Sequence, residues 1–149
     1  MFCLPGELPR CIHRARTELR EKTAAAIAGA RSPKEFLRLG LLAFFEFIDE
    51  HRRSWALLRQ EAAVAVPSAQ EEVEGIRQQQ TDMIGAVLAS FTPDIDPLEA
   101  EAFAEIVVGA TERLAVWTER RPKVGPALAT DYVMAVIWPG VANRLQTRT

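Results

Sequence analysis

The sequence predicts an all-α domain of six helices. Period-two alternation of apolar and polar residues is absent, and no Asn-Gly or Asp-Gly pair marks a hairpin turn, so strands are not expected. Helix starts are marked by Ser32, Ser68 and Asp96, each closely followed by an acidic residue. A chain of 149 residues, 48% hydrophobic and 26% charged, fits a single globular domain.

The first helix is expected over residues 10–30, with apolar or small residues along one face. That face comprises Ile12, Ala15, Leu19, Thr23, Ile27 and Ala30. The remaining positions are rich in arginine, but Glu18 and Glu21 are interspersed among them. An exposed face of mixed charge is therefore expected, and contact with phosphate groups is the alternative.

The second helix is expected over residues 33–50. Ser32 and Glu35 form a capping box, and Pro33 occupies the first helical position. Apolar side chains cover nearly the whole circumference of this helix, which is typical of a helix at the centre of a domain. These side chains are Phe36, Leu37, Leu39, Leu41, Leu42, Phe44, Phe45, Phe47 and Ile48.

The third and fourth helices are expected over residues 53–65 and 69–91, the latter starting after Ser68. The fourth contains the polar run 77–82, for which a solvated face is expected. The alternative is that Gln80 or Asp82 points inward to meet a ligand.

The fifth and sixth helices are expected over residues 97–120 and 126–145, with a kink or break at Pro139-Gly140. Both are apolar on more than one side, which exceeds what one core requires. Two such helices from each of two chains predict a four-helix dimer interface. A large monomeric core is the alternative. The interface candidates are Ala100, Ala104, Val108, Thr111, Ala115, Tyr132 and Val136.

Catalytic and metal-binding patterns are missing from the sequence. It has no Gly-rich phosphate loop, no Gly-x-Ser-x-Gly and no His-Glu-x-x-His. Glu46, Asp49, Glu50 and His51 are expected to be a solvated helix end with local ion pairs rather than metal ligands. A metal site at Cys3, Cys11 and His13 matches no zinc spacing. We therefore expect neither an enzyme nor a bound metal or cofactor.

The ends of the chain and its charge bear on its location and partners. The N-terminus lacks a basic region followed by an apolar run, and the longest apolar stretch is too short for a bilayer. The net charge of −2 suggests no general affinity for nucleic acid or membrane. We expect a cytoplasmic protein in which Cys3 and Cys11 do not form a disulfide.

Four stretches, in this order, carry a resemblance to a known family. They are residues 31–37, 42–51, 55–59 and 137–140, which read RSPKEFL, LAFFEFIDEH, WALLR and IWPG. Together with the helix order they resemble the C-terminal effector-binding and dimerisation domain of TetR-type bacterial transcription regulators. The resemblance covers about residues 10–146 and rests on helix order and texture, because this domain has no invariant motif.

The resemblance divides the chain into three parts. Residues 1–9 are expected to be an irregular remnant, residues 10–146 the ligand-binding and dimerisation domain, and residues 147–149 a tail. TetR-type regulators begin with a three-helix DNA-binding domain, whereas residues 1–149 hold no recognition helix. This chain is therefore not expected to bind an operator by itself. Either the DNA-binding head is absent, or Met1 is not the true start.

The resemblance also implies an effector cavity between the first four helices and the fifth. Aromatic and methionine side chains on apolar faces are the expected lining, and plain core packing is the alternative for each. The candidates are Phe44, Phe47, Trp55, Leu58, Met83, Val87, Phe103 and Trp117. Few ionisable groups fall on these faces, so a small, mostly apolar or aromatic effector is expected.

The expected function is effector sensing and dimerisation in a TetR-like transcription regulator, without a DNA-binding head in this chain. The alternative is a headless subunit that pairs with a full-length relative and antagonises it. An isologous interface accepts a close relative, and a dimer with one head would lose half of its phosphate contacts.

Overall fold

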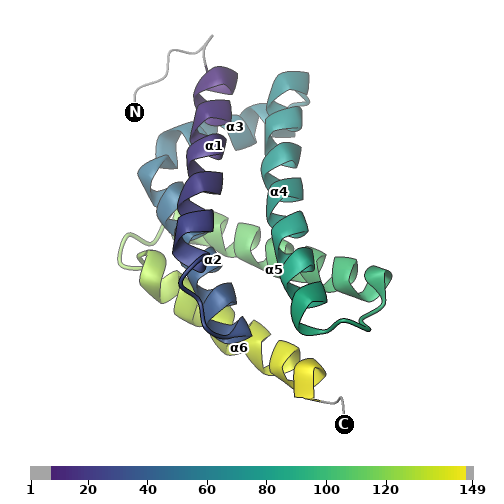
Figure 1. Cartoon of the computed structure of the whole chain (residues 1–149). Helices are drawn as coiled ribbons and strands as arrows, with labels where there is room; N and C mark the ends of the chain where they lie inside the picture. The colour runs from purple at the N-terminus through teal and green to yellow at the C-terminus, as the bar shows by residue number, and fades with distance from the viewer. Residues whose placement is uncertain (1–7, 147–149) are drawn as a thin grey trace.

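The computed structural model describes residues 8–146, and these residues form helices joined by short loops (Figure 1). The helices are α1 (Leu8–Ile27), α2 (Pro33–Glu50), α3 (Arg52–Ala63), α4 (Pro67–Phe91), α5 (Pro97–Thr118) and α6 (Pro126–Gln146). No strand occurs within this range, which confirms the predicted all-α class. None of these helices is long and apolar enough to cross a membrane.

The N-terminal boundary differs from the sequence-based expectation. Helix α1 begins at Leu8, so Leu8 and Pro9 belong to a helix rather than to an irregular segment. The rest of the expected remnant, residues 1–7, and the expected tail, residues 147–149, lie outside the described residues. So does Cys3, and with it the metal site considered at Cys3, Cys11 and His13. Cys11 is disulfide-bonded, so the expectation that the two cysteines of the chain do not pair was wrong.

Helix α2 lies at the centre of the fold, as its all-round apolar character predicts. It packs between α1 and α6 and also contacts α3, α4 and α5. Seven of its 18 residues are buried, among them Phe44, Phe45 and Phe47. Burying a phenylalanine side chain contributes roughly 1.5–3 kcal/mol, so α2 supplies much of the hydrophobic stabilisation.

Two of the three predicted helix caps are present. The Ser32 hydroxyl accepts a hydrogen bond from the backbone N–H of Glu35 at 3.1 Å, and the Asp96 carboxylate accepts one from Leu98 N–H at 2.9 Å. The third prediction was wrong: α4 begins at Pro67, and its N-cap is Val66, without a side-chain cap. Pro67 needs no hydrogen bond to its nitrogen and is pre-set for the first helical position, so the helix starts before Ser68.

The end of α3 explains why this helix stops earlier than expected. Ala65 has a φ of 64°, the left-handed conformation that usually requires glycine. Its N–H donates to the Ala62 carbonyl, and the N–H of Val66 donates to the Glu61 carbonyl. These two bonds form a Schellman motif, which turns the chain from α3 directly into α4.

The remaining helices enclose α2. In Figure 1, α1 and α4 run side by side, and α5 and α6 cross their lower ends. Helix α4 packs mainly on α5 and α3, and α6 packs mainly on α2. A kink or a break was expected at Pro139-Gly140; helix α6 continues through Pro139, so the break does not occur. Both residues are exposed, as is Ala135, whose carbonyl loses its helical partner to the proline ring and faces water instead.

Candidate functional site

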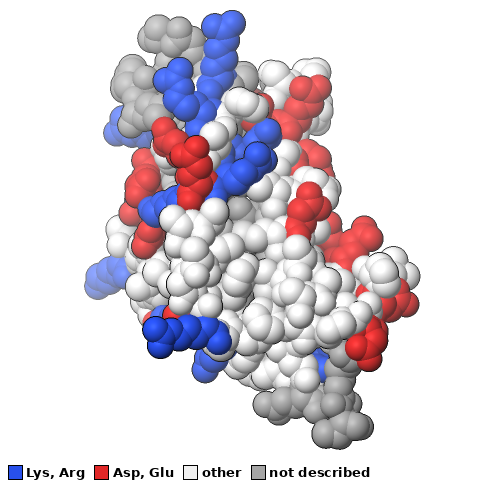
Figure 2. All heavy atoms as spheres, viewed as in Figure 1, with Lys and Arg blue, Asp and Glu red and all other residues white. Residues whose placement is uncertain are grey.

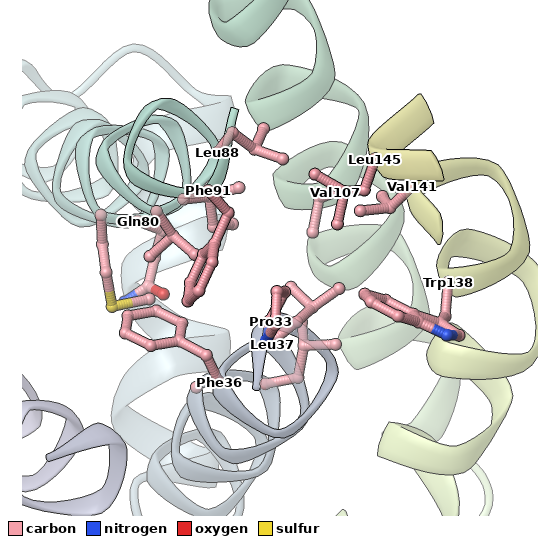
Figure 3. Close-up of a pocket in the computed structure, with 15 residues that line it drawn as sticks. Pro33, Phe36, Leu37, Gln80, Leu88, Phe91, Val107, Trp138, Val141 and Leu145 are labelled. Carbon is pink, nitrogen blue, oxygen red and sulfur yellow. The ribbon is translucent and has the colours of Figure 1, made fainter. Parts of the chain in front are cut away.

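A pocket with apolar walls opens between α2, α4, α5 and α6 (Figure 3). Fourteen of its 15 lining residues are apolar or glycine, and Gln80 is the one polar member. We call this space the apolar pocket. It is lined by Pro33, Phe36, Leu37, Gly40, Leu41, Gln80, Met83, Ile84, Val87, Leu88, Phe91, Val107, Trp138, Val141 and Leu145.

The apolar pocket has two ends of different character. At one end Phe36 and Phe91 lie beside the Gln80 side chain, and at the other Trp138, Val141 and Leu145 project from α6 (Figure 3). Phe91 is 47% exposed although it lines the pocket, so its ring stands at the boundary between the cavity and solvent. The cavity volume is about 40 Å³, which is narrow beside the roughly 300–1,000 Å³ of small-molecule sites.

Gln80 was expected on a solvated face, but its side chain is buried. The polar run 77–82 predicts a solvated face, but Gln80 is only 7% exposed and Thr81 only 6%. Its amide makes no hydrogen bond to any residue that the structure describes. Asp82, by contrast, is exposed and accepts a hydrogen bond from Gln78 at 2.7 Å. The inward-pointing alternative is therefore correct for Gln80 and wrong for Asp82.

A second cavity lies between α1 and α4, and we call it the α1–α4 cavity. Its volume is about 310 Å³, and Gln80 and Met83 line both this space and the apolar pocket. The other lining residues are Arg20, Thr23, Ala24, Ile27, Gln79 and Asp82. In Figure 2 charged side chains gather over the N-terminal part of α1, whereas the surface over the lower parts of α1 and α4 is largely uncharged.

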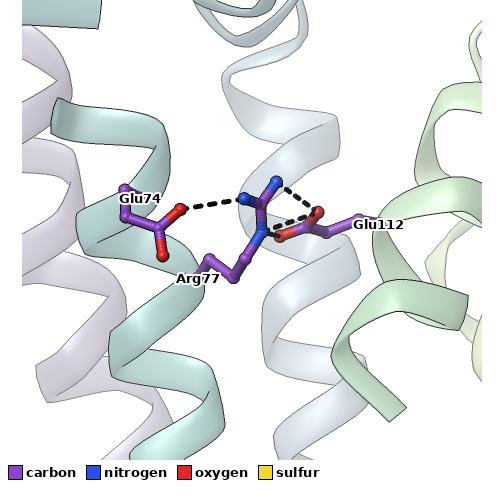
Figure 4. Close-up of polar contacts among 3 residues, drawn as sticks. All are labelled: Glu74, Arg77 and Glu112. Atoms are coloured by element: carbon purple, nitrogen blue, oxygen red, sulfur yellow. Dashed lines mark hydrogen bonds and ion pairs between the residues drawn. The ribbon is translucent and has the colours of Figure 1, made fainter. Parts of the chain in front are cut away.

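Ion pairs hold the helices that form these walls. Arg77 on α4 donates hydrogen bonds to Glu112 on α5 at 3.0–3.3 Å and to Glu74 at 2.9 Å (Figure 4). The hydrogen bond to Glu112 raises the pKa of the Arg77 guanidinium. A bidentate guanidinium–carboxylate pair fixes both distance and orientation, so it sets how α4 lies on α5.

A similar contact ties α1 to α4. Arg16 donates to Glu72 at 3.3 Å, and its guanidinium passes over Gly75. A Cβ atom at position 75 would lie 2.0 Å from Arg16 Nη1, so glycine provides the room for this pair. Arg20 likewise donates to Gln79 at 3.3 Å. Part of the arginine-rich face of α1 is therefore engaged by α4 rather than freely exposed.

At the α6 end of the apolar pocket, Arg144 pairs with Glu99 on α5. One hydrogen bond, from Nη2 to Oε2, is 3.1 Å long. This hydrogen bonding lowers the pKa of the Glu99 carboxyl and raises that of Arg144. The pair links α5 to α6 directly beside Leu145, which lines the pocket.

The predicted pocket residues divide into three groups, and Trp117 belongs to none of them. Met83 and Val87 line the apolar pocket. Phe44 borders a smaller hollow together with Gln80, and Trp55 borders another beside α3. Phe47 and Leu58 are buried in the core, and the half-buried Phe103 packs against it. Trp117 is half-buried, with the Arg121 guanidinium 4.3 Å from its ring centroid.

The principal residues that the sequence argument missed come from α6 and from the ends of α2 and α4. Trp138, Val141 and Leu145 line the apolar pocket, whereas α1 and α3 contribute nothing to it among the described residues. The cavity was expected among the first four helices and the fifth, so its position shifts toward α6. Phe36 and Phe91 were available as aromatic signals, but their location at helix ends gave no reason to group them.

The small-residue face of α5 lies in the core of one chain rather than on its surface. The small residues expected at a subunit interface are all buried within one chain: Ala100, Ala104, Val108, Thr111 and Ala115. Small side chains let α5 approach its neighbours closely, so this face belongs to the core. Ile106, on the opposite face, is 59% exposed. The two α6 candidates, Tyr132 and Val136, are 46% and 77% exposed.

The acidic cluster at the end of α2 is engaged in ion pairs, as predicted. Lys22 lies 2.8 Å from Glu46 and 3.2 Å from Glu50, and Asp49 pairs with Arg52. The hydrogen bond to Glu46 raises the pKa of Lys22. Within residues 8–146, no group of three or more His, Cys, Asp and Glu side chains is arranged to hold a metal ion.

Comparison with known proteins gives one family. Residues 33–140 match the model described as "Tetracyclin repressor-like, C-terminal domain". The match runs from the first residue of α2 to residue 140 within α6 and thus includes every residue that lines the apolar pocket except Val141 and Leu145. No curated protein matches the chain. Because the matched region exceeds half of the chain, the protein belongs to the family of tetracycline-repressor-like C-terminal domains, which are regulatory.

Proposed function

We propose that this chain senses a small, mostly apolar molecule in the apolar pocket and acts as a dimer through α5 and α6, as the regulatory part of a transcription regulator. The observation that carries the proposal is that α5 and α6 contribute both to the pocket and to the exposed apolar surface. A ligand that contacts Val107 and Trp138 therefore touches the helices that would meet the second chain.

The composition of the pocket supports an apolar ligand. Only Gln80 among its lining residues carries a side-chain hydrogen-bonding group able to fix a polar ligand, apart from the indole N–H of Trp138. Binding against such a wall removes apolar ligand surface from water, which contributes roughly 25 cal/mol of favourable free energy per Å² buried. A charged molecule lying wholly inside would lose its hydration without compensation.

The distribution of exposed apolar residues supports dimerisation. Of eight large hydrophobic residues that are exposed among the described residues, five belong to α5 and α6. These five are Leu98, Ile106, Leu128, Tyr132 and Val136. Their concentration on two adjoining helices is typical of a surface that a partner covers. In such a dimer, a ligand shifts the population between subunit arrangements by its differential affinity for them.

A pocket-filling variant tests the ligand site. Gly40 faces Met83, whose Cε would lie 3.4 Å from a Cβ at position 40, so Gly40→Leu places a side chain in the cavity. Gly85→Leu is the matched control, because no atom lies within 4 Å of its Cβ position and Gly85 does not line the pocket. In a thermal-shift screen of lipophilic compounds, those that raise the melting temperature of the wild type should raise that of Gly40→Leu less. They should raise the melting temperature of Gly85→Leu as much as that of the wild type. Ligands that stabilise all three equally would place the site elsewhere.

A charge placed on the exposed face tests dimerisation. Val136→Asp should convert a dimer of about twice 16.6 kDa into a monomer in sedimentation equilibrium, because two carboxylates would be buried without partners at the two-fold axis or beside it. Val64→Asp is the control, since Val64 at the end of α3 is 75% exposed, much like Val136 at 77%. A wild-type monomer at micromolar concentration, or a dimer that survives Val136→Asp, would contradict the proposal.

A further inference from the structure

The polar groups around the apolar pocket point to the kind of ligand that fits it. Thr23 on α1 and Gln80 on α4 both line the α1–α4 cavity. Thr23 is 3% exposed and Gln80 is 7% exposed. The Thr23 hydroxyl has no hydrogen-bond partner, and the Gln80 amide bonds to no residue within the described part of the chain.

Unpartnered buried polar groups are costly, by about 1–3 kcal/mol each. Two of the five threonine hydroxyls buried among the described residues avoid that cost by bonding to their own helix, whereas those of Thr23, Thr81 and Thr92 have no partner there, and of these three only Thr23 lines the α1–α4 cavity. Thr111 donates to the Val107 carbonyl at 2.7 Å, and Thr130 donates to the Pro126 carbonyl at 2.8 Å. Thr23 does not do so, although it also lies within a helix. Its hydroxyl is therefore available to a molecule in the cavity that it lines.

The two cavities are neighbours that share part of their lining. Gln80 and Met83 line both, so these two side chains lie between the apolar pocket and the α1–α4 cavity. Figure 3 shows the Gln80 side chain at the α2–α4 end of the apolar pocket, beside Phe36. The apolar pocket alone, at about 40 Å³, is too narrow for a whole small molecule, whereas the α1–α4 cavity adds about 310 Å³.

The chemistry of the rim favours a hydrogen-bond acceptor. The Thr23 hydroxyl and the Gln80 amide can each donate or accept a hydrogen bond, and the Arg20 guanidinium at the rim of the same cavity can only donate. Asp82 is the acidic residue among the lining, and its carboxylate accepts from Gln78. An oxygen acceptor placed between Thr23 and Gln80 would satisfy both.

We propose that the ligand is an elongated amphipathic molecule. Its apolar body occupies the apolar pocket, and its head, a carboxylate or carbonyl oxygen, accepts hydrogen bonds from Thr23 and Gln80 in the α1–α4 cavity. This inference rests on the proposed effector function and specifies the chemistry of the effector. The lining is apolar beside α6 and becomes more polar toward α1.

Three probes built on a ten-carbon chain test the inference: decanoate, its methyl ester methyl decanoate, and decylammonium. The first two carry an acceptor oxygen, and the third carries only donors. Calorimetric titration of the wild-type chain should show binding of decanoate and methyl decanoate, with the two ionic probes below their micellar concentrations and the ester below its solubility limit. Decylammonium should bind at least about tenfold more weakly. Equal affinity for all three probes, or no binding of decanoate, would overturn the inference.

Two variants test the role of the named side chains. Thr23→Val and Gln80→Leu should each weaken decanoate about five- to tenfold and leave decylammonium unchanged, because each removes one hydrogen bond to the head. Thr130→Val is the control and should leave decanoate affinity unaffected, since its hydroxyl lies outside both cavities. Unfolding midpoints without ligand show whether each variant folds. Unchanged decanoate affinity in folded Thr23→Val and Gln80→Leu would place the head elsewhere.

Gly40→Leu separates this inference from the proposed function. If that variant loses affinity for the probes while Thr23→Val and Gln80→Leu do not, the apolar pocket binds ligand but the head is not held as inferred. If all probes bind Gly40→Leu as well as wild type, the site is not the apolar pocket, and the proposed function fails together with the inference.

Discussion

The two halves of α4 are built in opposite ways. In the first half, Ala69 and Ile76 are 0% and 1% exposed, and Glu72 and Arg77 pair with α1 and α5. In the second half, from Gln80 onward, no side chain within the described residues makes a hydrogen bond or ion pair to another helix, and most of the inward-facing residues border a cavity. We call the part of α4 before Gln80 the fixed half, because other helices hold its side chains. The part from Gln80 onward is the free half, because cavities lie beside it.

This difference teaches where a ligand can act on the fold. Stability is not uniform across a protein, and segments with few anchoring contacts open at lower free energy. A cavity of about 40 Å³ can admit a molecule only if its walls move. If α4 moves, its fixed half stays in place and its free half shifts. Met83, Val87 and Phe91 lie on the free half and line the pocket.

The largest expected effect contrasts two isoleucines of α4. Ile76→Ala should destabilise the chain by an amount near the top of the roughly 2–5 kcal/mol range for such truncations, because Ile76 is enclosed on all sides. Ile84→Ala should cost at least about 1 kcal/mol less, since Ile84 already borders the apolar pocket. Urea unfolding at one protein concentration measures both. Equal losses would show that the two halves are equally well packed.

The next effect concerns the ion pair between α4 and α5. Arg77→Ala should cost about 1 kcal/mol, because the guanidinium is half-exposed and its pair with Glu112 is bidentate. A double-mutant cycle with Glu112→Ala isolates the coupling. Asp82→Ala, in the free half of α4, is the control and should stay within about 0.5 kcal/mol of wild type. A coupling energy indistinguishable from zero would show that the Arg77–Glu112 pair does not hold the first half of α4 in place.

The next prediction is a stabilising substitution in the turn that comes before the fixed half of α4. Ala65→Gly should raise the unfolding free energy by about 0.5–1 kcal/mol, because the φ of 64° strains an alanine and not a glycine. Ala63→Gly, at the last residue of α3, serves as the comparison and should be mildly destabilising. A loss of stability in both variants would mean that the Schellman turn does not persist in solution.

The smallest effect lies at the α6 end of the pocket and depends on pH. The hydrogen bond from Arg144 lowers the pKa of Glu99 in the folded state below its ordinary value of 4.5. The stabilisation is therefore complete above pH 4.5 and is lost as the pH falls through the folded-state pKa. Glu99→Gln should lower the melting temperature slightly at pH 7, and its difference from wild type should shrink in acid. A difference that grows in acid would contradict this sign.

Local chemistry predicts the start of a helix better than it predicts the burial of a face. Ser32 with Pro33, and Asp96 with Pro97, fix the first residues of α2 and α5, because capping involves residues adjacent in sequence. The all-round apolar character of α2 likewise predicts its central position. These features need no knowledge of the neighbouring helices.

The faces of α4 and α5 depend on tertiary contacts, so periodicity alone misassigned them. Gln80 lies in a polar run that reads as solvated, yet α1 and α2 pack on that side of α4. On α5 two apolar stripes are available, and the closeness of α4 selects the small residues for the core. The contribution of Trp138 to the pocket follows from how α6 packs on α2, which no local pattern specifies.

The most direct test of the central claim uses the methionine methyl groups as reporters in nuclear magnetic resonance. Met83 lines both cavities, whereas Met134 is buried in α6 outside them and serves as an internal control. Titration of the methyl-¹³C-methionine-labelled chain with decanoate should shift the Met83 signal and leave that of Met134 in place. A Met83 signal that stays unchanged at saturating decanoate would contradict a ligand site along the second half of α4.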